Sequence, residues 1–207
     1  MGFFQNTAKP KGFGGKLMVK GMNGGSHAKL AEWGFAHLEQ IPENAVVLDA
    51  GCGGGANIAR WLKRAPMGRI YGLDYSEVSV DESKKVNAKA INEGRCEVIQ
   101  ANVAKVPYAD NTFDYVSAFE TVYFWPDLSV TFKEILRVLK PGGIFLICNE
   151  STGHDKTSEK FSKIIDGMKL YDGEMLEKFL KTVGFQGIKT DIDEKNNRLC
   201  VVARKED

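Results

Sequence analysis

The sequence predicts an α/β domain built on a doubly wound, mostly parallel sheet of seven strands with an antiparallel hairpin at its C-terminal end. Short apolar runs of strand length alternate along the chain with segments of helical periodicity. The apolar runs are continuous, which is typical of parallel strands buried on both faces. The first of them ends in a glycine-rich turn that leads directly into a helix, LDAGCGGGANIARW at 48–61.

The elements follow one another in a regular order. A first amphipathic helix begins at Ser26, a plausible N-cap, and ends before Pro42. Strands are predicted at 45–50, 69–74, 96–101, 113–119 and 142–148, and helices at 56–65, 79–94 and 127–140, in βαβαβ order. A helix at 174–185 closed by Gly184 precedes two strands that flank 195–197, which predicts the antiparallel hairpin.

Residues 1–25 are rich in glycine and basic side chains and show no sustained period, so they are predicted to form an arm or lid. Residues 26–207 form the remaining domain, because no repeat or shift in composition divides them. The N-terminus has neither the apolar core of a signal peptide nor the pattern of a transit peptide. A cytoplasmic protein is therefore expected.

Composition narrows the classes of partner. Apolar residues make up 43% of the chain and charged residues 27%, and no apolar run approaches the length of a membrane span. We therefore expect no membrane span. The net charge of +1 provides no global electrostatic attraction to nucleic acid, so we expect no nucleic-acid partner either.

The four cysteines lie far apart along the chain, with no CxxC pair, which favours buried reduced thiols over metal ligands or disulfides: Cys52, Cys96, Cys148 and Cys200. No metal is predicted.

The glycine turn is predicted to be a ligand site. A strand that turns through glycines into a helix directs several backbone N–H groups toward the carboxyl edge of the sheet. Gly51 and Gly53 remove the Cβ atoms that would hold a ligand away from the main chain, and they permit positive φ. Asp49, near the end of a buried strand, needs a partner that a bare turn does not supply.

The glycine turn alone leaves two cofactors open. The segment from Gly51 to Ala56 also fits G-x-G-x-x-A, the weak dinucleotide fingerprint. Asp74 ends the next strand, where a carboxylate can accept hydrogen bonds from both ribose hydroxyls of a nucleoside. That feature fits a dinucleotide and other nucleoside cofactors equally.

Four segments, standing in one order, resemble the class I S-adenosylmethionine-dependent methyltransferases. They are VLDAGCGGG at 47–55, IYGLDYS at 70–76, the segment from Asn102 to Asp114, and LKPGGIFLICNE at 139–150. The resemblance runs from Ser26 to Lys205 and is strongest to small-molecule enzymes related to those of quinone biosynthesis. An NAD-dependent oxidoreductase fits less well, because no tyrosine has a lysine four places on, as short-chain reductases require.

The resemblance implies that the turn formed by Gly51, Cys52 and Gly53 faces the methionine part of S-adenosylmethionine. It also implies that Asp49 holds the ammonium group of the cofactor, directly or through water. A carboxylate beside donated N–H groups suits an amino-acid zwitterion better than a pyrophosphate.

On the nucleoside side, the resemblance implies that Asp74 accepts from the ribose hydroxyls and that Tyr75 lies beside the adenine. Asn102 stands where the family usually has aspartate, and its amide oxygen can still accept from the adenine amino group without charge assistance. Val103 is expected to offer its backbone N–H to the ring.

Candidate acceptor-side residues follow the fourth strand. Glu120 is expected beside the transferring methyl, where it either contacts the cofactor's amino group or serves as a base. Three aromatic residues after it fit a core or an acceptor-site lining, and their place after a strand's carboxyl end favours the lining: Tyr123, Phe124 and Trp125.

His27 is the second candidate base, because in this fold the N-terminal arm commonly folds over the cofactor and helps to build the acceptor pocket. Met22 and Asn23 belong to the same arm. A histidine near a helix start is more often an exposed cap than a catalyst. Glu150 and His154, after the fifth strand, can likewise be either site residues or ordinary surface residues.

The function implied by the resemblance is transfer of a methyl group from S-adenosylmethionine to a small-molecule acceptor by in-line displacement, leaving S-adenosylhomocysteine. A DNA or RNA methylase is disfavoured by the neutral charge and by the absence of an Asn-Pro-Pro-Tyr-like segment after the fourth strand. The alternative is a protein that binds S-adenosylmethionine without catalysis, as a regulatory module. Transfer of a labelled methyl group across a broad acceptor panel separates the two, and a metabolite screen addresses the identity of the acceptor.

Overall fold

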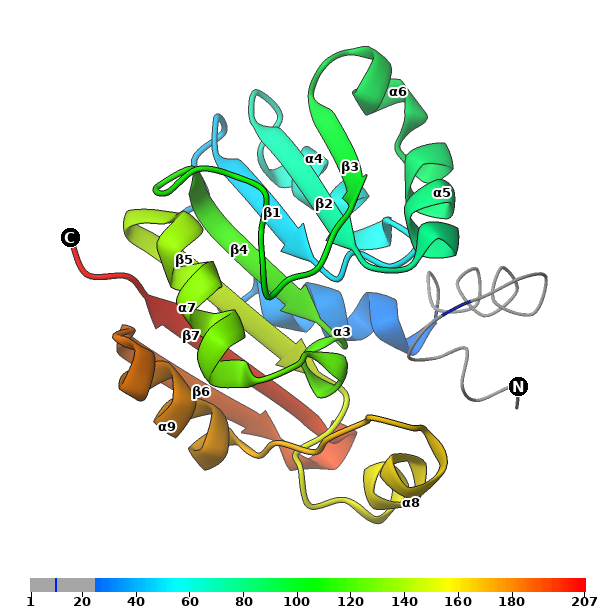
Figure 1. Cartoon of the computed structure of the whole chain (residues 1–207), viewed down its shortest axis with the longest axis vertical. Helices are drawn as coiled ribbons and strands as arrows, with labels where there is room; N and C mark the ends of the chain where they lie inside the picture. Colours follow the sequence, from blue (N-terminus) through cyan, green and yellow to red (C-terminus); the bar gives the residue numbers. More distant parts are fainter. Residues whose placement is uncertain (1–9, 11–24) are drawn as a thin grey trace.

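The computed structural model describes Pro10 and residues 25–207. Within these residues, seven strands form one sheet in the order β3-β2-β1-β4-β5-β7-β6. The first five strands pair in parallel and β7 is antiparallel to both of its neighbours, which confirms the predicted sheet (Figure 1). The strands are β1 (Val46–Ala50), β2 (Arg69–Asp74), β3 (Cys96–Gln100), β4 (Phe113–Phe119), β5 (Leu139–Asn149), β6 (Gln186–Asp193) and β7 (Arg198–Arg204).

The strand order reverses at β1, which has β2 on one side and β4 on the other. In open α/β sheets of this kind, ligands bind outside the carboxyl ends of the strands at the point of reversal. Asp49 lies at this point, and its register partners are Gly72 on β2 and Ser117 on β4. The topology therefore positions a site beside the glycine turn.

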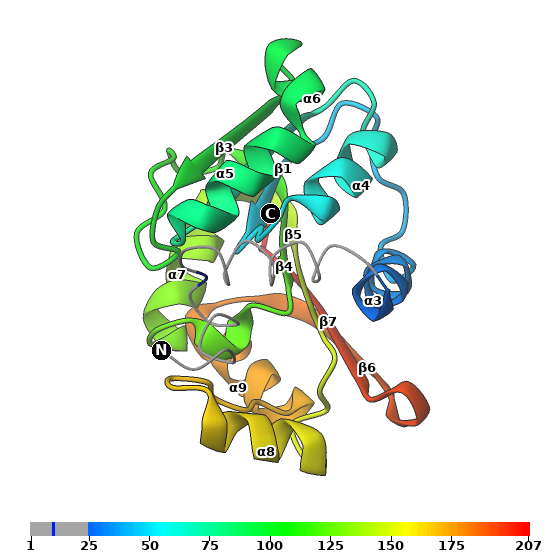
Figure 2. The same ribbon diagram turned by 90° about the vertical axis from the view of Figure 1, so that its right-hand side faces the viewer.

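Helices cover both faces of the sheet (Figure 2). Buried side chains of α3 (Ser26–Phe35), α4 (Ala56–Arg64), α5 (Glu77–Val86) and α6 (Ala88–Asn92) pack against one face. Those of α7 (Leu128–Val138) and α9 (Gly173–Val183) pack against the other. The remaining elements are α8 (Lys156–Ile164) and two short 3₁₀ turns, η1 (Val122–Phe124) and η2 (Glu194–Asn196).

The central strands are buried on both faces, as their continuous apolar sequences predicted. On β4, Tyr115 packs with the α3–α4 side while Val116 packs with the α7–α9 side. On β5, Leu146 packs with the α3–α4 side and Ile147 with the α7–α9 side.

All four cysteines are buried free thiols, as expected. No helix in the described part of the chain is both long and apolar enough to cross a membrane.

The first helix is shorter than predicted. α3 ends at Phe35, and the N–H groups of the next three residues donate to carbonyl oxygens three positions earlier, so the last turn is tighter than an α-helix. The Nδ1 atom of His37 also lies 2.9 Å from the Trp33 carbonyl oxygen. Gly25, with φ 63°, occupies the N-cap position, so the N-cap predicted at Ser26 is one residue too late. Except for Pro10 and Gly25, the predicted arm lies outside the described residues, together with its Met22 and Asn23.

The helix predicted at 79–94 is divided into α5 and α6. Asn87, at the join, is buried, and its Nδ2 donates to the carbonyl oxygens of Gly55 (3.1 Å) and Ser83 (3.0 Å). The amide that interrupts the helix thus contacts the end of the glycine turn.

A loop at 101–112 leads from β3 directly to β4, in agreement with the predicted elements, which placed no helix between these two strands. The sequence did not predict α8, whose residues are mostly exposed and lack an apolar stripe.

Candidate functional site

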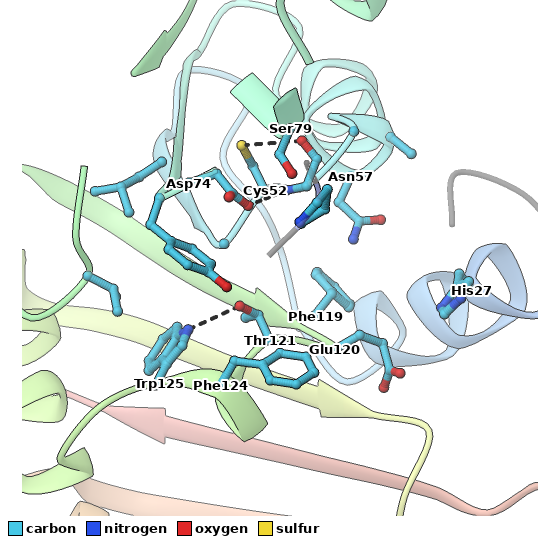
Figure 3. Close-up of a pocket in the computed structure, with 18 of the residues that line it drawn as sticks. His27, Cys52, Asn57, Asp74, Ser79, Phe119, Glu120, Thr121, Phe124 and Trp125 are labelled. Atoms are coloured by element: carbon cyan, nitrogen blue, oxygen red, sulfur yellow. Dashed lines mark hydrogen bonds between the residues drawn. The ribbon is translucent and has the colours of Figure 1, made fainter. Parts of the chain in front are cut away.

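A cavity of about 300 Å³ opens at the carboxyl ends of β1, β2, β3 and β4 (Figure 3). Most of its lining comes from the glycine turn and the start of α4, the end of β2, residues 101–103, residues 119–126 and the first turns of α3, and Ser79 of α5 adds to it. The predicted residues Gly51, Cys52, Gly53, Asp74, Tyr75, Asn102, Val103, Glu120 and His27 all line this cavity, as does Pro10.

The glycine turn has the backbone geometry that the sequence predicted. Gly51 and Gly53 have φ of 79° and 50°, a region that L side chains rarely adopt. The N–H groups of Gly51 and Cys52 both donate to the Leu73 carbonyl oxygen, at 2.7 and 3.0 Å, which ties the turn to β2. A Cβ at Gly51 would lie 2.1 Å from the hydroxyl oxygen of Thr121, whereas one at Gly53 would meet nothing within 4 Å. Gly53 therefore faces open space.

Asp49 lies buried just before this turn and does not line the cavity. Its Oδ1 accepts a hydrogen bond of 2.7 Å from Ser117, whose hydroxyl accepts one of 2.9 Å from the Trp61 indole. Its Oδ2 is buried with no hydrogen-bond partner among the described residues. Burial raises the pKa of this carboxyl to about 7. An N–H donor or a water molecule would satisfy the orphaned oxygen.

Asp74 lies on the cavity wall with both oxygens hydrogen-bonded to the main chain. Oδ2 accepts from the Gly53 N–H at 3.0 Å, and Oδ1 accepts from the Ser76 N–H at 2.8 Å. Burial raises the pKa of this carboxyl, and the backbone hydrogen bonds oppose that shift. Each oxygen keeps a second lone pair for a ligand hydroxyl. The Ser76 hydroxyl donates to the Pro10 carbonyl oxygen at 3.0 Å, which places Pro10 at this edge.

The residues predicted to contact the adenine differ in solvent exposure and in whether their polar atoms already accept a backbone hydrogen bond. Tyr75 is 40% exposed and Val103 is buried. Asn102 is exposed, but its Oδ1 accepts from the Ala104 N–H at 2.9 Å and so closes the turn after β3. The amide oxygen predicted to accept from adenine is thus already engaged by the main chain. Its role toward the cofactor stays a prediction.

Glu120 follows β4 directly and has φ of 57°, in the left-handed region where non-glycine residues are uncommon. Its Oε1 accepts from the Tyr123 hydroxyl at 3.0 Å and from the backbone N–H of Glu150. Burial, reinforced by the charge of Glu150, raises the pKa of this carboxyl to about 7. Such a group can exchange a proton near neutral pH, which is what a general base requires.

The aromatic residues after Glu120 divide between the cavity and the core. Phe124 and Trp125 line the cavity, whereas Tyr123 is buried outside it with its hydroxyl on Glu120. The Trp125 indole donates to the Thr121 hydroxyl at 3.1 Å and stacks on the Phe145 ring of the core. Of the weaker candidates, Glu150 lies beside the cavity, and His154 lies elsewhere, 3.0 Å from Asp172.

Several site residues were not predicted. Ser117 contacts Asp49 only because β4 pairs with β1, and strand neighbours cannot be read from the sequence. Arg60 and Asn57 line the cavity from one face of α4 and are hydrogen-bonded to each other at 3.1 Å. Their position three residues apart in the first turns of the helix was the available signal.

The sequence matches a family model described as a methyltransferase domain over residues 48–147. A cycloartenol-C-24-methyltransferase of Oryza sativa subsp. japonica is 39% identical over 101 residues, which are 49% of this chain and 29% of that protein. A sterol 24-C-methyltransferase of Debaryomyces hansenii is 32% identical over 161 residues, which are 73% of this chain and 42% of that protein. The chain thus spans less than half the length of these relatives.

Solved structures share the fold at low sequence identity. A chain from the complex of the Haloferax volcanii Trm112 methyltransferase activator with a methyltransferase superposes with a TM-score of 0.83 at 20% identity, covering 99% of this chain and 98% of that one. An S-adenosylmethionine-dependent methyltransferase of Aquifex aeolicus gives 0.73 at 20% identity, covering 91% and 97%. Residues 48–147 therefore carry a methyltransferase domain within the fold that these solved structures share. The sequence relatives support the predicted resemblance to the class I S-adenosylmethionine-dependent methyltransferases.

Proposed function

We propose that this protein transfers a methyl group from S-adenosylmethionine to a small-molecule acceptor and releases S-adenosylhomocysteine. The observation that carries the proposal is the orphaned carboxylate oxygen of Asp49, buried next to a glycine turn that opens on a cavity. A buried carboxylate oxygen without a donor is costly, and a cationic N–H group or a water held by one would satisfy it. The amino-acid end of S-adenosylmethionine carries such a group.

The described residues fit the rest of this cofactor. Asp74 would accept from the ribose hydroxyls with its remaining lone pairs, and Val103 and Tyr75 would flank the adenine. Gly53 leaves open space where the methionine part would approach the main chain. When bound, the cofactor supplies a methyl group already activated by the sulfonium. The protein therefore needs chiefly to align the acceptor and to exclude water.

The acceptor side of the cavity performs these two tasks. Phe124 and Trp125 present apolar rings that exclude water and suit an acceptor with an apolar or planar body. Glu120 can accept a proton at its carboxylate, and His27 offers an imidazole at the same edge. The curated relatives are named for sterol substrates, which agrees with a small organic acceptor without identifying it.

Two alternative functions, binding of a dinucleotide and cofactor binding without catalysis, make different chemical demands on the site. A dinucleotide would bring its pyrophosphate against the glycine turn, next to the buried carboxyl group of Asp49, which opposes a second negative charge there. A protein that binds the cofactor without catalysis would keep the glycine turn, and the open cavity beside Glu120 favours an enzyme over this alternative.

Calorimetry with S-adenosylhomocysteine and with NAD tests the cofactor, and transfer of a labelled methyl group across a broad acceptor panel tests the reaction. We expect binding of S-adenosylhomocysteine and label in at least one acceptor class. Tight NAD binding without S-adenosylhomocysteine binding would overturn the proposal. Binding with no transfer to any acceptor would favour the regulatory alternative.

A further inference from the structure

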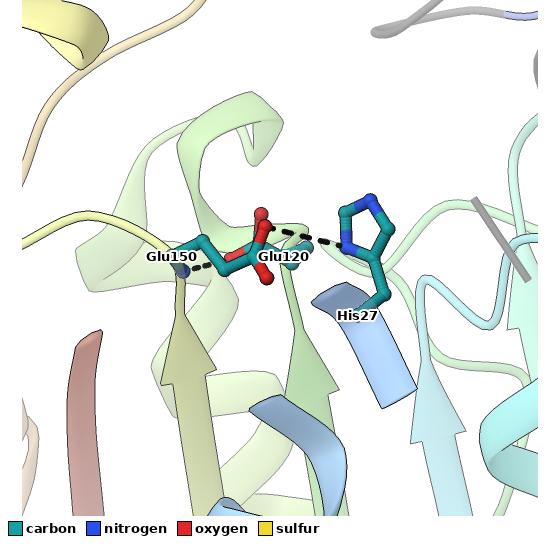
Figure 4. Close-up of side chains that lie close together, drawn as sticks. All are labelled: His27, Glu120 and Glu150. Atoms are coloured by element: carbon teal, nitrogen blue, oxygen red, sulfur yellow. Dashed lines mark hydrogen bonds and ion pairs between the residues drawn. The ribbon is translucent and has the colours of Figure 1, made fainter. Parts of the chain in front are cut away.

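Three side chains with metal-binding atoms converge beside the cavity from three separate elements (Figure 4). His27 lies in the first turn of α3, Glu120 follows β4 and Glu150 follows β5. One atom of each, an imidazole nitrogen or a carboxylate oxygen, lies within 4.8 Å of the other two. We propose that these residues bind one divalent metal ion at the acceptor side of the cavity.

The distances suit a shared ion better than direct pairing. His27 Nδ1 and Glu150 Oε2 lie 3.8 Å apart, which is too far for a hydrogen bond. Ligand atoms bound tetrahedrally at about 2.1 Å from one ion stand about 3.4 Å from each other. The widest separation here, 4.8 Å at most, therefore has to close by roughly 1.4 Å to reach coordination distance, a movement within the reach of side-chain rotation.

The surroundings orient the ligands and leave them accessible. Hydrogen bonds from the Tyr123 hydroxyl and the Glu150 N–H fix one oxygen of Glu120. This pins the carboxylate in place and leaves its other oxygen to face a ligand. The side chains of His27 and Glu150 are 33% and 27% exposed, so an ion can reach them from solvent.

The donor set indicates the class of metal. One imidazole with two carboxylates suits first-row transition ions such as Mn²⁺, Fe²⁺ and Zn²⁺ better than Ca²⁺, which prefers oxygen ligands alone. The two carboxylates balance the charge of a divalent ion. Three protein ligands leave at least one coordination position open, as in catalytic metal sites.

The open position bears on the proposed methyl transfer, on which this part of the inference rests. His27 and Glu120 also line the cavity, so an oxygen of the acceptor can reach the ion from that side. A bound cation lowers the pKa of a coordinated hydroxyl, which favours an oxygen acceptor over an apolar carbon acceptor. The sequence alone led us to expect no metal, because the three ligands lie far apart along the chain.

The test uses the full chain, freed of metals with a chelator and then titrated with MnCl₂, with free Mn²⁺ followed by electron paramagnetic resonance. ZnCl₂ is titrated in parallel by calorimetry. We expect one saturable site per chain and an affinity at least tenfold weaker in Glu150→Gln and in His27→Gln. His154→Gln is the matched control, because His154 pairs with Asp172 outside the cluster, and it should bind the ions like the parent.

Circular dichroism melts establish that each variant is folded. The metal assignment is wrong if neither ion binds saturably up to about 1 mM, a concentration far above that at which specific sites fill. It is also wrong if the folded variants bind as tightly as the parent, or if an alkylammonium salt binds at the cluster while neither metal does.

S-adenosylhomocysteine binding, measured on the same parent sample, separates this inference from the proposed function. Cofactor binding without metal binding would defeat only the metal site. Metal binding without cofactor binding would defeat the proposed function and leave the metal site standing.

Discussion

The two walls of the cavity are built in different ways. The wall formed by the glycine turn and the end of β2 uses the main chain, with positive φ at Gly51 and Gly53. The backbone N–H groups of the turn donate to the Leu73 carbonyl oxygen and to the Asp74 carboxylate. The opposite wall, formed by α3 and residues 119–126, uses side chains, among them Phe124. We infer that the first wall serves the constant cofactor and the second serves the acceptor.

This difference explains why the main-chain wall should tolerate few substitutions. A main-chain wall depends on which residues lack a Cβ, so a single methyl group can disrupt it. A side-chain wall can be rebuilt residue by residue while the fold stays the same. The following experiments test whether the two walls separate in this way, beginning with the largest expected effect.

Gly51→Ala should abolish S-adenosylhomocysteine binding or weaken it more than a hundredfold. The added Cβ would lie 2.1 Å from the Thr121 hydroxyl oxygen, and the left-handed backbone adds strain of about 1–2 kcal/mol. Gly53→Ala has a similar φ with no protein atom within 4 Å, so it should lose only about that strain energy in thermal unfolding, although its Cβ would enter the space proposed for the methionine part of the cofactor. Equal melting temperatures in the two variants would contradict this account of the turn.

Asp74→Ala should weaken S-adenosylhomocysteine binding by about 2–3 kcal/mol and should also destabilise the protein. It removes the predicted ribose acceptor and leaves two backbone N–H groups, those of Gly53 and Ser76, without their carboxylate, each at a cost of about 1–3 kcal/mol. Asp74→Asn, which keeps the shape and one acceptor oxygen, should recover part of both losses. Calorimetry and chemical denaturation measure them, and unchanged affinity in the alanine variant would remove Asp74 from the site.

Binding of S-adenosylhomocysteine should weaken about tenfold between pH 8 and pH 6. The pKa of Asp49 is raised to about 7, and an ammonium group of the ligand favours the ionised carboxylate, which is lost below that pH. The unliganded protein should behave in the opposite sense. A raised native pKa contributes stability that is present below pH about 4 and is lost as the pH rises through about 7. Asp49→Asn should flatten the binding profile and reduce the slope of the stability profile, to which Glu120, with a pKa also raised to about 7, still contributes. A pH dependence of binding that survives this substitution would assign it to another group.

Phe124→Ala should have the smallest effect on the cofactor and a selective one on the acceptor. Removing an apolar ring from the side-chain wall should raise KM for the acceptor severalfold while S-adenosylhomocysteine affinity changes by less than about twofold. Steady-state kinetics with the acceptor identified by the panel measures this split. A loss of cofactor affinity equal to the rise in KM would show that the two walls are not independent.

The main-chain wall was largely predictable from the sequence and the side-chain wall was not. The strand, glycines and helix of the turn are contiguous, and local rules are sufficient to predict their geometry. Ser117, which completes the environment of Asp49, became visible only once β4 was paired with β1. Glu150 joins His27 and Glu120 through the fold, and no sequence spacing reports that convergence.

The errors in secondary structure have the same origin. α3 ends early: the His37 N–H donates to the Gly34 carbonyl oxygen, and the Trp33 carbonyl oxygen, which a longer helix would use, accepts from the His37 ring. α5 and α6 separate where the Asn87 amide bonds to Gly55, a residue of a different element. α8 has few buried side chains, so it shows no periodic pattern to detect. Side-chain contacts therefore accompany the first two differences, and the lack of buried side chains explains the third.

The Asn87 amide has a wider consequence. Its Nδ2 donates to the carbonyl oxygen of Gly55, at the end of the glycine turn. A Cβ at Gly55 would lie 2.5 Å from this Nδ2, so the glycine turn packs closely against the junction of α5 and α6. We infer that the stiffness of the glycine turn is set in part by Asn87, a residue that does not line the cavity. Substitution at the α5–α6 junction thus offers a route to change how long a ligand stays bound without altering any residue of the cavity lining.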